Sequence, residues 1–372
     1  MRREVAVSVV LVVAPVFARA QPEEMEVLTA EPEAHAGLAC DVRTEHVRPG
    51  FLVASWENDG PLHAIAFGDD RHFTNGNSVE ASVLPSAMMY DRRLRWLDVF
   101  GEFREPRSAI GVMARQTFYT PELLTDSNNQ PDDWPYNGLL TGGVFLQRSE
   151  GALFDHMQLD VGVMGQDAGG QPLQEWVHSA LPRQVNPTWA GQVANQLAVQ
   201  AQYQRRWKLR WQRDAEGAMS RVPSEELGDG GAAETPGVEL IPYVGLRAGT
   251  IFVDGSFGVI ARCGWPLPND FGPSRLYEFT DHTQRGADDF GFSIFARAGG
   301  RVVQHNALLR GSVFDSPRLD EQVLVGEFHL GMQFQWEGFE LGYSQTLVTG
   351  EFEGQNSGNR TGTWTLIFNL AH

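Results

Sequence analysis

Two side chains four residues apart, Gln174 and His178, could together activate a water molecule. Pro172 suits the first position of a helix and Pro182 ends one, so both side chains lie on a short predicted helix. Residues four apart share one face of a helix. A histidine changes charge near neutral pH and can act as a general base, with the glutamine close enough to orient the imidazole or the water. Helical histidines are more often packed or solvated, so the pair alone is a weak signal.

The N-terminus has the pattern of a secretory signal over residues 1–20. Arg2 and Arg3 provide the positive end, residues 5–17 the apolar core and residues 18–20 a small-residue cleavage site. No later run reaches the roughly 18 apolar residues that a spanning helix needs. The mature chain is therefore expected to be exported, either as a soluble protein or as a β-barrel.

The net charge and the cysteine content indicate which partners and which covalent cross-links to expect. The net charge of −18 argues against a nucleic-acid partner, which requires a basic surface. Cys40 and Cys263 are the two cysteines, and an oxidising periplasm would permit a disulfide between them. We expect no structural disulfide, because Cys40 lies in a leader at residues 21–49 that is rich in Glu, Pro and Ala.

From residue 50 to residue 372 the dominant pattern is alternation of apolar and polar side chains, which indicates strands with two unlike faces. The strands are long, with aromatic residues near their ends and Gln, Arg and Gly on the polar face, which favours a transmembrane barrel over a soluble one. We therefore predict an all-β fold, a transmembrane antiparallel barrel of about 12 strands with a short helix in an extracellular loop. The predicted strands are 51–59, 72–84, 108–119, 136–149, 153–166, 198–212, 237–249, 251–264, 290–304, 321–336, 338–350 and 361–370.

The joins between these strands differ in length. Glu150-Gly151 and Glu337-Gly338 predict tight turns. Residues 85–107, 213–236 and 265–289 are long joins that do not fit the short periplasmic turns of such barrels. Residues 213–236 have the composition of a flexible insertion.

An even number of strands brings both chain ends to the periplasm and fixes the direction of every strand. The first strand then delivers Asn58 and Asp59 to the outer rim, the second leaves it with Thr74, and the fifth leads into the helix with His178. These segments converge where a substrate in the outer leaflet would meet them. Each also has an ordinary interpretation, since Asn58-Asp59-Gly60 is typical of a turn.

A set of short motifs resembles one known family in both content and order. The motifs are Asn58-Asp59, residues 71–76, Tyr119-Thr120-Pro121, residues 135–138, the block from Gly165 to His178, residues 267–273 and residues 342–345. In this order they are similar to those of the outer-membrane lipid A 3'-O-deacylases, the LpxR family, over nearly all of the mature chain.

The resemblance implies an outer-membrane carboxylic ester hydrolase that removes the 3'-linked acyloxyacyl chain of lipid A, with lipopolysaccharide as substrate and a monomeric state. His178 would activate water, and Asn58, Asp59 and Thr74 would complete the site. Asn58 and Asp59 would hold Ca²⁺, which prefers oxygen ligands and would polarise the ester carbonyl as in secreted phospholipase A2. The role of Gln174 is inferred from helical spacing alone.

The chain departs from the family pattern at Trp134, where an arginine is usual, and the Asp69-Asp70 pair adds negative charge nearby. The departure could weaken phosphate recognition or alter the choice of substrate. Two alternatives stay open at this point: an outer-membrane phospholipase or general esterase, and a non-catalytic pore or structural barrel. No Gly-x-Ser-x-Gly nucleophile motif is present, so the sequence gives no support to an α/β-hydrolase.

Overall fold

The computed structural model describes residues 47–370, apart from residues 59–71, 87–88, 90–93, 99–101, 123, 125–131, 181–186, 215, 229–235, 274–275, 277, 284–289, 311–318 and 356. The predicted signal and nearly all of the predicted leader, with Cys40, lie outside this range, as does Asp59. Within the described residues no helix is long and apolar enough to cross a membrane.

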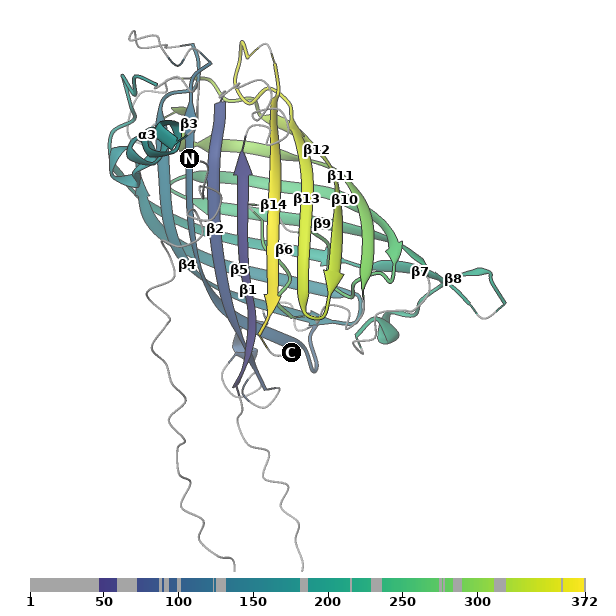
Figure 1. The fold of residues 1–372 in the computed structure, drawn as a ribbon. Coiled ribbons are helices and arrows are strands. Elements are labelled where there is room, and N and C mark those ends of the chain that lie inside the picture. Colours follow the sequence, from purple (N-terminus) through teal and green to yellow (C-terminus); the bar gives the residue numbers. More distant parts are fainter. Residues whose placement is uncertain are drawn as a thin grey trace, which may run out of the picture. The chain divides into compact units, whose positions relative to one another are not determined.

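The described strands form one antiparallel sheet that closes on itself through the pairing of β9 with β10 (Figure 1). The barrel strands are β1 (Val47–Asn58), β2 (His72–Pro85), β3 (Arg107–Thr120), β4 (Asn137–Glu150), β5 (Leu153–Met164), β6 (Gln196–Trp207) continued by β7 (Leu209–Arg213), β9 (Gly237–Gly249), β10 (Phe252–Trp265), β11 (Gly291–Asn306), β12 (Leu324–Trp336), β13 (Phe339–Val348) and β14 (Asn359–Asn369). With β6 and β7 counted as one strand interrupted at Lys208, the prediction of twelve strands is confirmed.

Short helices, 3₁₀ turns and one short strand lie in the connections between the barrel strands. They are β8 (Met219–Arg221), the 3₁₀ turns η1 (Arg95–Leu97), η2 (Gln166–Ala168) and η3 (Ser224–Gly228), and the helices α3 (Gly170–Ala180) and α4 (Ala307–Arg310). The helix predicted around Gln174 and His178 is therefore confirmed as α3. The join predicted to be a flexible insertion contains β8, which pairs with β7, and η3.

Alternation along the strands separates an apolar outer face from a polar inner face. In β1, Leu52 and Trp56 are exposed, whereas Ser55 and Glu57 are buried inside the barrel. The same rule holds for β12, where Phe328, Leu330 and Met332 are exposed and His329 and Gln333 are buried. An apolar exterior around a polar interior is the arrangement of barrels that cross membranes.

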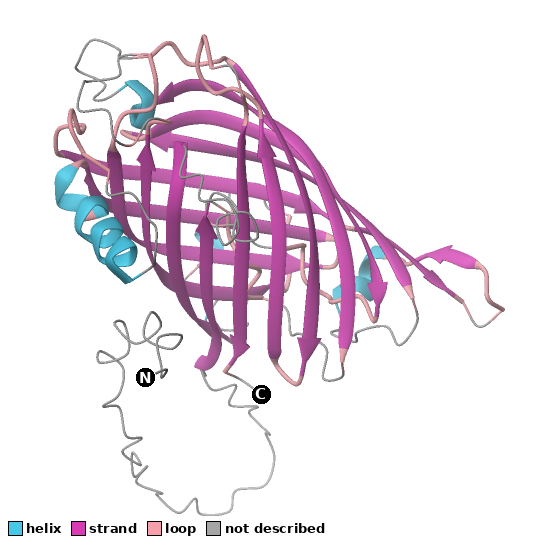
Figure 2. Cartoon of the chain, turned by 45° about the horizontal axis from the view of Figure 1, so that its top comes forward, coloured by secondary structure: helices cyan, strands magenta, loops and turns pink. Residues whose placement is uncertain are grey.

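The two ends of the barrel are built differently. We call the end with the start of β1 and the end of β14 the terminal end, and the opposite end, with α3, the helix end (Figures 1 and 2). Two joins at the terminal end are tight, as predicted: Gly151 follows β4, and Glu337-Gly338 connects β12 to β13 with φ of 43° and 78°. Positive φ at both turn residues matches the twist of the flanking strands.

The lumen is filled at the terminal end by the join between β10 and β11. We call residues 266–283 the lumen segment. Its described residues contact inward side chains of β1, β2, β4, β5, β6, β7, β10 and β11. Phe271 stacks on Phe154 of β5, with ring centroids 5.2 Å apart. The described residues 266–283 of this long join therefore turn into the barrel.

Charged groups hold the lumen segment in place. Arg262 of β10 bridges Glu239 of β9 (2.6 Å) and Asp270 of the segment (2.7 Å), with its side chain fully buried. Arg297 of β11 pairs with Glu278. Burial acts to raise the pKa of Glu278, but Arg297 more than offsets it and lowers the pKa to about 2. The carboxylate therefore stays charged at neutral pH and the ion pair persists.

Candidate active site on the outer wall of the barrel

The inner face of α3 carries both side chains that the sequence singled out. Gln174 is 1% exposed and His178 is 8% exposed, whereas Trp176 on the opposite side is 47% exposed. Gly170, one turn before Gln174, is also buried, so residues 170, 174 and 178 form one stripe. The prediction that Gln174 and His178 share a face is confirmed.

That face lies against the outside of the barrel wall at the helix end (Figures 1 and 2). The helix packs on β3 and β4. Gln116 of β3 donates a hydrogen bond to the carbonyl oxygen of Ala168, just before α3 (2.7 Å). Phe118 and Trp189 close around Gly170, where even a Cβ atom would come within 2.7 Å of the Trp189 ring. The absence of a side chain at Gly170 therefore lets the helix approach the wall closely.

Asn58 lies on the same outer side of the wall, because it shares the face of β1 that carries the exposed Leu52 and Trp56. Its Nδ2 donates a hydrogen bond to the carbonyl oxygen of Thr74 on β2 (2.8 Å). The register of β2 against β3 shifts between Phe73 and Asn75, so Thr74 is the extra residue of a bulge. Bulges re-aim side chains and are common next to active sites.

Hydrogen bonds of the bulge residue Thr74 connect the first three strands at the helix end. The hydroxyl oxygens of Thr74 and Thr120 lie 2.7 Å apart, which ties β2 to the end of β3. Asn58, Thr74 and Thr120 thus stand on neighbouring strands, and α3 packs on the third of them. The end of β1, the start of β2 and α3 therefore lie at the same end of the barrel, as predicted for the segments that carry Asn58, Thr74 and His178.

A band of polar side chains marks this part of a wall that is elsewhere apolar. It contains Gln345, Asn58, Asn75, Asn77 and Gln116, which are half-buried and alternate with inward residues along β13, β1, β2 and β3. The family motifs contain Asn75, Thr120 and Gln345, but the resemblance gave these residues no role, and Asn77 and Gln116 lie outside the motifs. Their phase relative to Trp56 and other exposed apolar residues is the signal that could have identified them.

The oxygen donors in this region suit a hard cation. Asn58 and the hydroxyl groups of Thr74 and Thr120 offer only oxygen ligands, which Ca²⁺ prefers. Over the described ranges, no group of three or more His, Cys, Asp and Glu side chains gathers in a way that could hold a metal. Asp59, the carboxylate predicted to complete the site, lies outside those ranges. The described donor set therefore fits calcium but does not by itself make a complete site.

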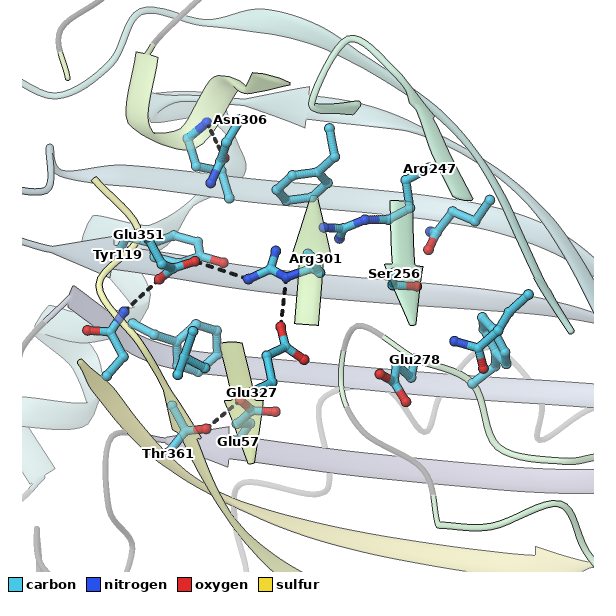
Figure 3. A pocket seen from close by; sticks show the side chains of 18 of the residues that line it. Glu57, Tyr119, Arg247, Ser256, Glu278, Arg301, Asn306, Glu327, Glu351 and Thr361 are labelled. Carbon is cyan, nitrogen blue, oxygen red and sulfur yellow. Dashed lines mark hydrogen bonds and ion pairs between the residues drawn. The ribbon is translucent and has the colours of Figure 1, made fainter. Parts of the chain in front are cut away.

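The barrel interior offers a second candidate location. Between the lumen segment and the helix end lies a cavity of about 90 Å³ lined by Glu57, Arg247, Arg301 and Glu327 among others (Figure 3). Its three arginines are already paired: Arg301 with Glu327 (2.7 Å), Arg247 with Asp254 and Arg297 with Glu278. None of the four described residues predicted for the site lines this cavity, so the candidate site is the outer wall.

Trp134 faces the interior and not the candidate site. Its ring stacks on Tyr119 with centroids 4.8 Å apart, and only 1% of the residue is exposed. Both rings line the cavity. Trp134 therefore contributes to the packing of the lumen, whereas Asp69 and Asp70 lie outside the described residues.

Comparison with known proteins identifies the relatives of this chain. The family model described as outer membrane protein LpxR matches residues 5–370. Among solved structures, LpxR from Salmonella typhimurium superposes with a TM-score of 0.64 and 20% identity, covering 86% of this chain and 99% of that one. The transport unit of the autotransporter AIDA-I from Escherichia coli gives a TM-score of 0.36 and 12% identity, covering 89% and 92%. No curated protein matches the chain.

Proposed function

Since the chain belongs to the LpxR family of outer-membrane lipid A 3'-O-deacylases, which are ester hydrolases, we propose that it cleaves the 3'-linked acyloxyacyl ester of lipid A at the outer wall beneath α3. The observation that carries this proposal is the buried face of α3, with Gln174 and His178, packed on a lipid-facing wall that carries Asn58, Thr74 and Thr120. A lipid can reach this site from the outer leaflet without leaving the membrane.

His178 is the general base of the proposed reaction. As water attacks the ester carbonyl, the imidazole takes one of its protons, and the new C–O bond gives a tetrahedral intermediate. When the intermediate collapses, the bond to the sugar oxygen breaks and the imidazolium returns the proton to that oxygen. The products are the free acyloxyacyl acid and the 3'-hydroxyl group. Gln174, one turn before His178, orients the imidazole or the water.

Burial favours this role for His178. A wall of protein on one side and lipid on the other restricts bulk water, which strengthens the polar interactions that remain. The Asn58 amide is held by the hydrogen bond that it donates to the carbonyl oxygen of Thr74, and the Thr74 hydroxyl group is held by that of Thr120. They need no rearrangement when charge develops, which is the condition for effective electrostatic stabilisation.

Calcium fits the proposed site, with Asn58 and Asp59 as ligands. When bound, the ion supplies positive charge to the carbonyl oxygen of the ester and to nearby phosphates of the substrate. Asn58 presents its amide at the end of β1, and Thr74 and Thr120 add hydroxyl oxygens beside it. A protein with a net charge of −18 gains from a cation wherever it binds an anionic lipid.

The direct test is the reaction itself. Purified protein in detergent should release the 3'-linked chain from lipid A, seen by mass spectrometry as loss of one acyloxyacyl group, and should leave glycerophospholipids intact. Hydrolysis of phospholipids at a similar rate would favour a general esterase and contradict the proposed substrate.

Removing calcium should lower activity by about 100-fold or more, because a site that stabilises a developing oxyanion contributes at least that much. Adding Ca²⁺ back should restore the rate, and Mg²⁺ should do so poorly because it demands near-ideal octahedral geometry. Asp59→Asn should raise the calcium concentration needed for half-maximal activity. The matched control is Asp167→Asn, which removes an exposed carboxylate from the turn before α3. Full activity of the wild-type protein in excess chelator would exclude the ion.

A further inference from the structure

Arg360 is an exposed cation on the outer wall close to the candidate site. Along β14, Thr361, Thr363 and Thr365 are buried inside the barrel, so Arg360 lies on the opposite, outward side. It is exposed, and its guanidinium has no ion-pair or hydrogen-bond partner among the described residues. Since none of the described residues neutralises this guanidinium, we take it to be available to an anionic ligand.

The register of the sheet places Arg360 beside the polar band. Asn58 pairs directly with Gly362 of β14, and Arg360 lies two residues further towards the helix end. A strand rises about 3.3 Å per residue and neighbouring strands lie about 4.8 Å apart, so the Cα atoms of Arg360 and Asn58 are roughly 8 Å apart. Gly362 has no side chain to fill the space between them.

The interior of the barrel fixes the direction in which Arg360 points. The preceding residue, Asn359, is buried in the lumen, where its Nδ2 donates a hydrogen bond to Glu351 (2.7 Å). Glu351 in turn pairs with Arg301 (3.2 Å; Figure 3). Because successive side chains of a strand alternate, anchoring Asn359 inside directs Arg360 outside.

The same anchor holds the strand that carries Thr74. Asn359 Oδ1 lies 2.5 Å from Nδ1 of His72, the first residue of β2. Two residues later the bulge presents Thr74 to the candidate site. The starts of β2 and β14, and with them Thr74 and Arg360, are therefore positioned by one buried polar cluster.

The proposed substrate, lipid A, carries an anionic group that Arg360 could bind. The glucosamine ring of lipid A that bears the 3'-linked ester also bears a phosphate at the adjacent 4' carbon. A planar guanidinium binds phosphate through two parallel hydrogen bonds, which fix orientation as well as supplying charge. Resting on the proposed function, we propose that Arg360 binds the 4'-phosphate of lipid A and so selects the ester next to it.

The test uses equilibrium binding, so that it does not depend on turnover. In a His178→Ala background, binding in detergent would be measured for three lipids: lipid A with both phosphates, lipid A without the 4'-phosphate and lipid A without the 1-phosphate. Arg360→Gln should weaken binding of the first and third lipids by roughly 10- to 100-fold, the range expected for a hydrogen-bonded charge. It should leave binding of the lipid without a 4'-phosphate unchanged.

Two control variants separate specific recognition from general effects. Arg48→Gln removes an exposed arginine from β1 at the terminal end and should change none of the three affinities. Arg360→Lys keeps the charge without the planar fork and should recover part of the loss. Equal weakening for all three lipids, or no weakening for any, would overturn the proposal. A loss confined to the lipids that keep the 1-phosphate would assign Arg360 to the other phosphate and overturn it as well.

Kinetics in the wild-type background distinguish this inference from the proposed function. If the protein deacylates lipid A and Arg360→Gln acts on lipids with and without the 4'-phosphate at the same rate, the inference on Arg360 fails alone. If His178→Ala retains activity, the proposed base fails, while the rates of Arg360→Gln on lipids with and without the 4'-phosphate still decide the role of Arg360.

Discussion

Replacing His178 with alanine should lower the rate of ester hydrolysis by about 10²- to 10⁴-fold, the usual contribution of a positioned general base. The imidazole lies on the buried face of α3, and its loss leaves no other histidine on that helix. The effect should fall on kcat, because the proton transfer occurs in the transition state and not in substrate binding. Mass spectrometry of lipid A over time measures the rate.

Two controls make the His178 result interpretable. Ser179→Ala changes the exposed neighbour on the same helix and should keep wild-type activity. Both variants should still migrate as heat-modifiable barrels, because α3 packs on the outside of a sheet that closes without it. Wild-type turnover by the folded His178→Ala protein would eliminate this residue as the base.

Replacing Arg262 with methionine should destabilise the protein by about 3–5 kcal/mol, the cost of leaving a buried charge without its partner. Arg262 is fully buried between Glu239 and Asp270, so its loss leaves Asp270 without this ion pair, whereas Glu239 keeps its pair with Arg210. The unfolding midpoint in urea and the temperature of heat modification should both fall. Because Asp270 belongs to the lumen segment, the barrel should also show increased conductance in a planar bilayer.

A compensated variant tests the electrostatic explanation. Adding Asp270→Asn to Arg262→Met removes the carboxylate that has lost its ion-pair partner, while Glu239 stays charged opposite Arg210, and should restore most of the stability. If the double variant were as unstable as the single one, packing of the arginine and not its charge would be responsible. An Arg262→Met protein with the stability and the bilayer conductance of the wild type would contradict the role assigned to this ion-pair group.

The barrel could be predicted from sequence because its determinants are local. Apolar and polar side chains alternate along each strand because the wall separates lipid from a polar lumen. The tight turns are marked by Gly151 and Gly338, which adopt positive φ. The α3 helix was recognisable from Pro172 and Pro182. The first strand begins at Val47, inside the predicted leader, because pairing with β2 extends it beyond the alternating stretch.

The lumen segment could not be predicted, because residues 266–283 have no hydrophobic period. Their position depends on long-range pairs such as Lys208 with the carbonyl oxygen of Asn269 (2.7 Å) and Gln147 with that of Thr280 (2.7 Å). Each partner is an inward residue of a strand far away in sequence. From the chain alone, residues 265–289 were only a long join that did not fit the short periplasmic turns of such barrels.

The sequence predicted at which end of the barrel the candidate site lies, but not whether it lies on the inner or the outer side of the wall. Asn58 follows Glu57, and only the phase of β1 decides which of the two faces lipid. The exposed Trp56 settles that phase, and the same reasoning on β14 from Trp364 and Phe368 places Arg360 outside. Trp134 shows the opposite case, because its inward stacking on Tyr119 depends on a loop with no period to read.

The filled bore has a consequence for the cell that carries this protein. A porin of similar size trades nutrient entry against entry of antibiotics and detergents, but here the described residues of the lumen segment fill the terminal end of the bore, while the proposed chemistry takes place on the exterior. We therefore expect that copies of this protein, acting as proposed, alter the surface lipids without making the envelope more permeable to such solutes.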